Sequence, residues 1–162
     1  MKFQGPNRRQ FVAVIAGGVL ALMLAVGGIV YVRQFTPLAG LPREAYRGLT
    51  FPVYFPKHPP SGFVFDPKSV SSRSKVLAYN FTYQGQKPVN VSIQPLDPSL
   101  DVTSFNPTRI INPPIGTGYL AVYDTRTTVA IVAGKSLVLV NSPDGVPDAM
   151  VEQFANSLQV AN

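Results

Sequence analysis

The chain has 162 residues, no cysteine and a formal net charge of +6 at pH 7. Without cysteine it has no disulfide bonds, no cysteine-ligated zinc and no thiol catalysis. Four of the 14 basic residues flank one apolar segment, which leaves ten basic residues against eight acidic ones elsewhere. Because that remainder has no basic block interleaved with aromatic residues, the composition argues against nucleic-acid binding. The four flanking residues are Lys2, Arg8, Arg9 and Arg33.

Residues 11–32 form an uncharged segment that follows a basic tail of residues 1–10. An α-helix of this length extends about 33 Å, enough to cross a hydrocarbon core of roughly 30 Å. Twelve of its 22 residues are Phe, Val, Ile or Leu, which favour insertion into a bilayer. The segment therefore predicts a single-pass transmembrane helix that anchors the protein in the lipid bilayer of the cell membrane.

We expect the N-terminus to be cytoplasmic and the C-terminal domain to be extracytoplasmic. The basic residues before the segment lean in this direction. Ten residues are too few to fold, whereas the chain after residue 32 has the length of a domain. Two alternatives stay open: Arg8 and Arg9 also resemble a twin-arginine export signal, and cleavage near Gly27 would release the domain.

Small residues recur at every fourth position of the apolar segment, so they share one face of the expected helix. This spacing lets two helices approach closely. Eight of the 22 residues are Ala or Gly, so the same spacing also arises easily by chance. It indicates weak self-association through Ala13, Gly17, Ala21 and Ala25.

Residues 33–48 are expected to be a short tether, because prolines and a glycine interrupt them. The extracytoplasmic domain then comprises residues 49–162. In residues 51–55, apolar positions alternate with polar or proline positions, which predicts a half-buried strand. Its prolines lack N–H donors and place it at a sheet edge or in an extended lead-in. Residues 58–62 are expected to form a turn.

Two antiparallel hairpins are predicted further along the chain. Within residues 75–83, the odd positions from 77 to 83 are apolar or aromatic, and the alternation resumes in residues 89–93 after a Gln-Gly-Gln turn. This pattern predicts one buried face and one polar face. The second hairpin joins residues 129–133 to residues 137–141 through a Gly-Lys turn of type II′. Its consecutive apolar residues indicate central strands that are covered on both faces.

The remaining segments are a proline-rich stretch, a strand and a C-terminal helix. Residues 95–118 contain five prolines, with a short helix expected at residues 98–105 and Asp97 as its N-cap. A strand follows at residues 119–124. Residues 147–158 predict an amphipathic helix with one apolar stripe. The predicted fold class is therefore α+β: an N-terminal transmembrane helix, then an antiparallel β-sheet with the C-terminal helix packed on it. The stripe consists of Met150, Val151, Phe154 and Leu158.

The sequence FPVYFP at residues 51–56, followed by PSGF at residues 60–63, resembles the opening of a family of uncharacterised bacterial extracytoplasmic domains. Members carry a tyrosine-x-proline and then a proline-x-glycine-aromatic entry, and they end in paired strands and a short amphipathic helix. They often follow one membrane helix, and some relatives belong to anti-sigma-factor-like membrane proteins. The resemblance covers roughly residues 49–158. It implies location and fold, and it transfers no catalytic residue.

The polar residues predict no catalytic, metal-binding or cofactor-binding group. The one histidine, His58, lies in the expected turn, and the Ser–Lys neighbours of the chain project to opposite faces of a strand. We therefore expect a non-enzymatic extracytoplasmic module, without a cofactor, that serves interaction or sensing with an unknown protein partner. Its candidate contacts are Ile110, Ile111 and Ile115 in the proline-rich stretch.

An alternative function is the binding of a hydrophobic ligand, a lipid or a peptide, between the sheet and the helix. Aromatic residues of the first hairpin and of the strand at residues 119–124 would line such a pocket. The same residue types also build ordinary cores. The candidate lining residues are Tyr79, Phe81, Tyr83 and Tyr119.

Overall fold

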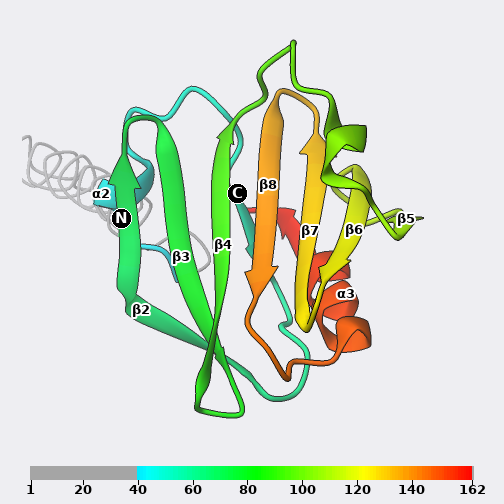
Figure 1. Cartoon of the computed structure of the whole chain (residues 1–162). Helices are drawn as coiled ribbons and strands as arrows, with labels where there is room; N and C mark the ends of the chain where they lie inside the picture. Colours follow the sequence, from blue (N-terminus) through cyan, green and yellow to red (C-terminus); the bar gives the residue numbers. More distant parts are fainter. Residues whose placement is uncertain (1–39, 162) are drawn as a thin grey trace, which may run out of the picture. The chain divides into compact units, whose positions relative to one another are not determined.

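The computed structural model describes residues 40–161 (Figure 1). The predicted transmembrane segment, its small-residue stripe, the basic tail and the first part of the predicted tether lie outside these residues. Within residues 40–161, no helix is both long enough and apolar enough to cross a membrane.

Seven strands form one antiparallel sheet in the order β2-β3-β4-β8-β7-β6-β5, and β1 pairs with β9 in a separate two-stranded ribbon. Consecutive strands pair as hairpins, and the two halves of the sheet join where β4 pairs with β8. The antiparallel sheet and the C-terminal helix α3 confirm the predicted α+β domain. In chain order the elements are α2 (Arg43–Tyr46), β1 (Tyr54–Pro56), β2 (Phe63–Arg73), β3 (Val76–Tyr83), β4 (Lys87–Pro95), the 3₁₀ helix η1 (Val102–Phe105), β5 (Arg109–Ile111), β6 (Thr117–Tyr123), β7 (Arg126–Ala133), β8 (Ser136–Ser142), α3 (Asp148–Asn156) and β9 (Leu158–Val160).

Both predicted hairpins are present. In the first, β3–β4, Tyr79 lies opposite Val91 and Phe81 lies opposite Val89, so the large apolar side chains of the two strands share one face. The second, β7–β8, turns at Gly134, whose φ of +60° suits the first residue of a type II′ turn. These two strands lie in the middle of the sheet, as their consecutive apolar residues predicted.

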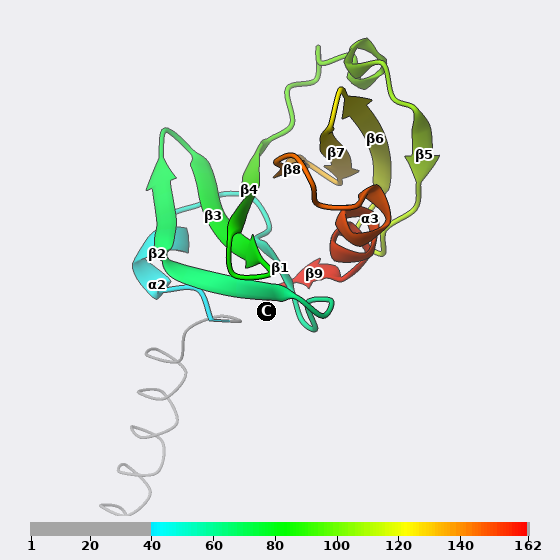
Figure 2. The same cartoon turned by 60° about the horizontal axis from the view of Figure 1, so that its bottom comes forward.

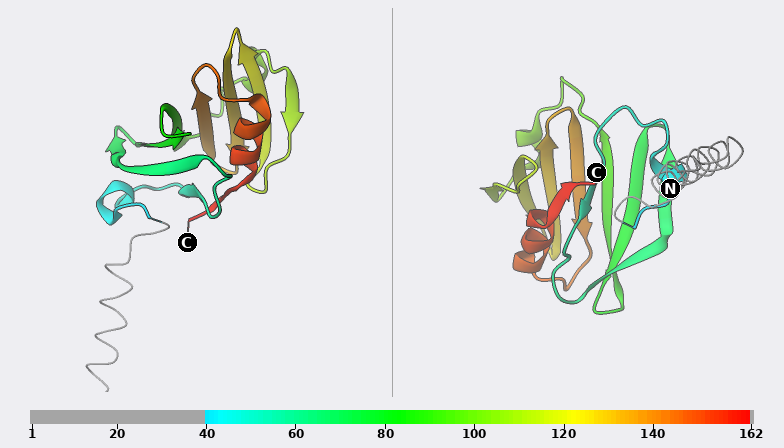
Figure 3. Two further views of the ribbon diagram at one scale, coloured as in Figure 1. Left: turned by 90° about the horizontal axis from the view of Figure 1, so that it is seen from below. Right: turned by 180° about the vertical axis from the view of Figure 1, so that it is seen from behind.

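The sheet has an inner face, which carries α3, β1 and β9, and an outer face, which is turned toward the viewer in Figure 1. Figure 3 shows the inner face from behind, and Figure 2 shows that the sheet is strongly curved around these elements. Aromatic rings fill the inner face: the centroid of Phe81 lies 4.9 Å from that of Phe154 in α3 and 5.6 Å from that of Phe55 in β1. The helix and the ribbon therefore seal this face with a closed hydrophobic core.

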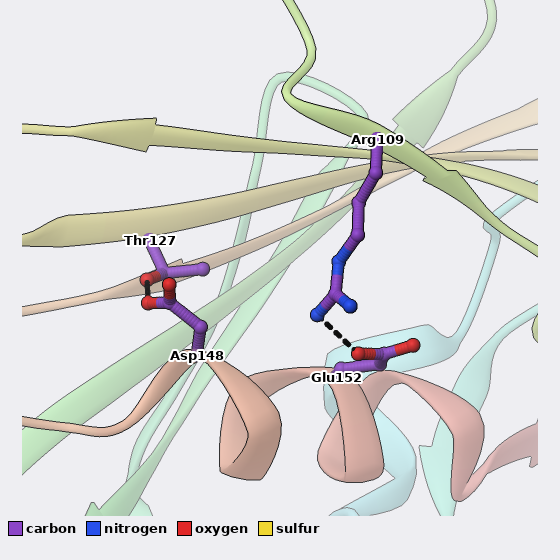
Figure 4. Close-up of polar contacts among 4 residues, drawn as sticks. All are labelled: Arg109, Thr127, Asp148 and Glu152. Carbon is purple, nitrogen blue, oxygen red and sulfur yellow. Dashed lines mark hydrogen bonds and ion pairs between the residues drawn. The ribbon is translucent and has the colours of Figure 1, made fainter.

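Two polar contacts fasten α3 to the sheet (Figure 4). The hydroxyl of Thr127, in β7, donates to the carboxylate of Asp148 in the first turn of the helix. One turn later, Glu152 forms an ion pair with Arg109 of β5. A carboxylate in the first turn also suits the positive end of the helix dipole. Both contacts join side chains, and together they hold the helix against β5 and β7.

The C-terminal helix is shorter than predicted. It ends at Asn156, and Leu158 is buried as the first residue of β9 rather than as the last residue of the helix. β9 pairs with β1, with Tyr54 opposite Val160. Because this ribbon lies against the core, Tyr54 is buried as well as Phe55. The predicted alternation of residues 51–55 is therefore wrong at Tyr54, although Pro52 is exposed between two buried residues as expected.

The folded domain begins earlier than residue 49. Leu41 has no exposed surface, and Ala45, in α2, also belongs to the hydrophobic core. The described part of the predicted tether, residues 40–48, is therefore part of the domain.

β2 is a long edge strand that the sequence pattern did not predict. Its pairing with β3 is interrupted by a bulge between Asp66 and Ser71. The hydroxyl of Ser69 bridges this bulge, because it donates to the carbonyl of Asp66 at 2.6 Å and accepts from the amide of Asn80 at 2.7 Å. A bulge of this kind protects an exposed sheet edge from pairing with another chain.

The short helix of the proline-rich stretch begins later than predicted, and Asp101 caps it in place of Asp97. The carboxylate of Asp101 accepts from both the amide and the hydroxyl of Thr103, the amide at 2.9 Å. These hydrogen bonds, the hydroxyl first, hold the pKa of Asp101 below its ordinary value. Asp97 makes the same contacts to Ser99 in the turn before the helix.

Candidate binding site

The structure does not bring the four predicted aromatic residues together in a pocket. Tyr79 and Phe81 have no exposed surface and Tyr83 has little, so these three belong to the closed core of the inner face. The hydroxyl of Tyr79 donates to the carbonyl of Tyr54 at 2.6 Å, and burial raises its pKa well above the usual range. Tyr119 lies on the outer face, because the register across five strands aligns it with Ala78.

The three predicted isoleucine contacts are also separated. Ile110 is 62% exposed and lies opposite Tyr119 on the outer face of β5 and β6. Ile111, its neighbour in β5, is buried in the core, and Ile115 packs against the core in part. Of the three, Ile110 alone presents most of its side chain to solvent.

A groove of about 890 Å³ lies on the outer face, where the three connections β3–β4, β6–β7 and β8–α3 meet. Figure 1 shows these connections at the same, lower end of the sheet. The groove is open to solvent and is lined by side chains from β4, β6, β7 and β8. None of the residues predicted from the sequence as contacts lines it.

The floor of the groove is a row of polar side chains across adjacent strands. Asn90 of β4 lies opposite Asn141 of β8, which in turn lies opposite Thr128 of β7. The amide of Asn90 donates to Asn80 at 2.8 Å, and the hydroxyl of Thr128 donates to the side-chain oxygen of Asn141 at 3.1 Å. Within residues 40–161, the Oδ1 of Asn90 accepts no hydrogen bond from the protein. In the same part of the chain, the Nδ2 of Asn141 donates none. The row therefore offers one acceptor and one donor side by side to a ligand.

The rim of the groove holds two cations that converge on one acidic residue. The Nζ of Lys87 donates to the backbone carbonyl of Asp144 at 2.7 Å, and the Nε of Arg126 lies 3.5 Å from the carboxylate of the same residue. Both members of the Arg126–Asp144 pair are mainly exposed, so this pair stabilises the fold little. The three side chains together leave a formal charge of +1 at the rim.

An aromatic ring forms another part of the wall. Tyr123, at the end of β6, is 47% exposed. Its hydroxyl donates to the carbonyl of Phe105 in η1, which holds the ring in place. Pro88 of β4 and Pro143, which follows the end of β8, add apolar surface. The groove therefore combines a polar floor with fixed apolar walls.

The alternation in the first hairpin had placed Asn80 and Asn90 on a polar face, which the structure confirms. The alignment of Asn141 and Thr128 with them had no signal in the sequence, because it depends on strands far apart in the chain. Among residues 40–161, no three residues of the types His, Cys, Asp and Glu are grouped as a metal site.

Comparison of the chain with protein-family models finds no match. Comparison with curated proteins finds no match either. The family resemblance drawn from residues 51–63 therefore stays a prediction.

Proposed function

We propose that the protein is a non-enzymatic binding module, anchored in the cell membrane by residues 11–32, whose extracytoplasmic domain engages its ligand or partner in the outer-face groove. The observation that carries this proposal is the contrast between the two faces of the sheet. The inner face is closed by α3, β1 and β9, whereas the outer face has a groove with unused hydrogen-bonding groups.

The construction of the groove supports recognition. Its polar residues stand on paired strands of the sheet centre, so their positions are set by the backbone ladder rather than by a loop. Its volume lies in the range of roughly 300–1,000 Å³ typical of sites for small ligands or short segments of larger ones. The membrane anchor, whose support is the uncharged apolar segment of the sequence, would keep this groove close to the membrane surface.

Site-specific photo-cross-linking tests the location of binding. A benzophenone amino acid replaces Gln86, which is exposed and lines the groove but is not one of its floor residues. In a control chain it replaces Val64, which is 62% exposed on the outer face of β2 and does not line the groove. We expect an adduct, identified by mass spectrometry after irradiation of native membranes, at position 86 and none at position 64. Equal adducts at both positions, or none at position 86, would refute the groove as the binding site.

Protease accessibility tests the proposed topology. Protease added outside spheroplasts should remove the domain and leave a short membrane-bound stub. Replacing Leu20 and Leu22 with Arg, at roughly 2.5–3.5 kcal/mol each near a helix centre, should abolish stable insertion. A protected domain, or a soluble domain of the length expected for cleavage near Gly27, would contradict the anchored topology.

A further inference from the structure

We infer that the outer-face groove binds a neutral saccharide chain. This inference rests on the proposed function and names the ligand class of the same site. It begins with the floor, where the free acceptor of Asn90 and the free donor of Asn141 lie on directly opposed residues. Sugar hydroxyl groups both donate and accept hydrogen bonds, and an acetamido substituent offers one donor and one acceptor. Either matches this pair, whereas a purely anionic group would use the donor alone.

The strand arrangement disfavours an extended peptide as the ligand. Peptides that bind sheets usually add as a strand to an unpaired edge through backbone hydrogen bonds. The floor of the groove lies on β4, β8 and β7, each of which already has a hydrogen-bonded neighbour on both sides. Recognition here depends on side chains that project from the sheet face. Such a surface suits a ligand whose polar groups are its own substituents, as in a saccharide.

The walls suit the apolar faces of sugar rings. A pyranose ring presents C–H groups on its face and hydroxyl groups around its rim. The ring of Tyr123 is half exposed and is held by its hydrogen bond to Phe105, so its face is available without loss of side-chain freedom. Pro88 supplies a second rigid apolar surface on the other side of the groove.

The charge of the rim argues against a polyanion. Lys87 and Arg126 both contact Asp144, so their charge is offset by one carboxylate and held in the rim. Binding of a polyanion gains its affinity from several cations that each replace counterions. One net positive charge offers little of that gain. We therefore expect neutral saccharides to bind more tightly than sulfated ones of the same length.

The test uses the full chain in detergent micelles and saturation-transfer NMR. The probes are the tetrasaccharide of N-acetylglucosamine, maltotetraose and a sulfated tetrasaccharide. The variants are Asn90→Ala and Asn141→Ala, with Ser92→Ala as the matched control, because Ser92 projects from the same face of β4 outside the groove. Melting temperatures of all variants confirm that they are folded. Asn141 is exposed, so its variant keeps the test valid if Asn90→Ala does not fold.

We expect at least one neutral probe to bind, and each asparagine variant to weaken that binding about 2- to 12-fold for each hydrogen bond lost. Ser92→Ala should leave the affinity unchanged. Tighter binding of the sulfated probe, an equal loss in the control, or no binding of either neutral probe overturns the saccharide inference. If the photo-cross-link at position 86 then identifies a protein, the proposed function stands and only the ligand class is wrong. If that cross-link is also absent, both fail.

Discussion

Replacing Phe81 with Ala should destabilise the domain more than any change on the outer face. Phe81 has no exposed surface, and its ring centroid lies within 5.6 Å of the rings of Phe55, Phe65 and Phe154. It therefore links β1, β2 and α3 to the centre of β3. Loss of a buried phenylalanine costs about 3–5 kcal/mol, because apolar contacts are lost and a cavity remains.

That cost converts into a large fall in melting temperature. The described residues 40–161 number 122. At about 2.1 cal/mol/K per residue, their unfolding entropy is about 0.26 kcal/mol/K, so the melting temperature should fall by about 12–19 °C. Far-UV circular dichroism of the full chain in detergent measures this change during heating.

The control is Val64→Thr, which keeps a β-branched residue at an exposed position of β2. We expect its stability to change by less than about 0.5 kcal/mol, or about 2 °C. A fall of less than about 5 °C in the Phe81 variant would show that the aromatic residues of the inner face do not act as the core. In that case the closed inner face, and with it the argument for the groove, would be wrong.

Three further changes test other contacts. Thr103→Val removes the hydroxyl that does most to lower the pKa of Asp101, so NMR titration should show that pKa rising toward 3.8. In the unmodified chain the cap should persist just below pH 3.8 and be lost as the pH falls through the lowered pKa; an unchanged pKa in the variant would count against the cap. Gly116→Ala places a Cβ 2.0 Å from the carbonyl oxygen of Val132, so thermal unfolding should show a loss of about 1–3 kcal/mol, and a wild-type melting temperature would contradict this geometry. Tyr79→Phe removes one buried hydrogen bond and should lower the free energy of unfolding, measured with urea, by about 1 kcal/mol. An unchanged urea midpoint would show that this hydrogen bond does not stabilise the domain.

The alternation of residues 75–83 and 89–93 was sufficient to predict β3, β4 and their buried face. A strand has a period of two residues, so a shift of one residue would expose every aromatic side chain of β3. This signal is local and needs no knowledge of the partner strand. The β7–β8 turn had an equally local signal in Gly134, a residue type that accepts positive φ. The start of α3 had one in Pro147, which directly precedes the carboxylate of Asp148.

Other elements depended on tertiary pairing. The residues of β2 after Phe65 show no apolar–polar alternation. They form a strand because they pair with the backbone of β3. Leu158 fits the apolar stripe of a helix, yet it lies in β9, where β1 supplies the pairing that ends α3. Local propensity is similar for both outcomes at these positions, so contacts with distant residues decide them.

The candidate site shows the same division. Asn90 could be assigned to a polar face from its own strand, because alternate residues of a strand project to opposite faces. Asn141, with Thr128 beside it in the β7–β8 hairpin, comes next to Asn90 only through the β4–β8 register, which joins residues 51 positions apart in the chain. The sequence alone determined which residues are buried in the first hairpin and which face is polar. The tertiary structure decided that this polar face forms a groove, because hydrogen-bonded register between distant strands is set by the packing of the whole core.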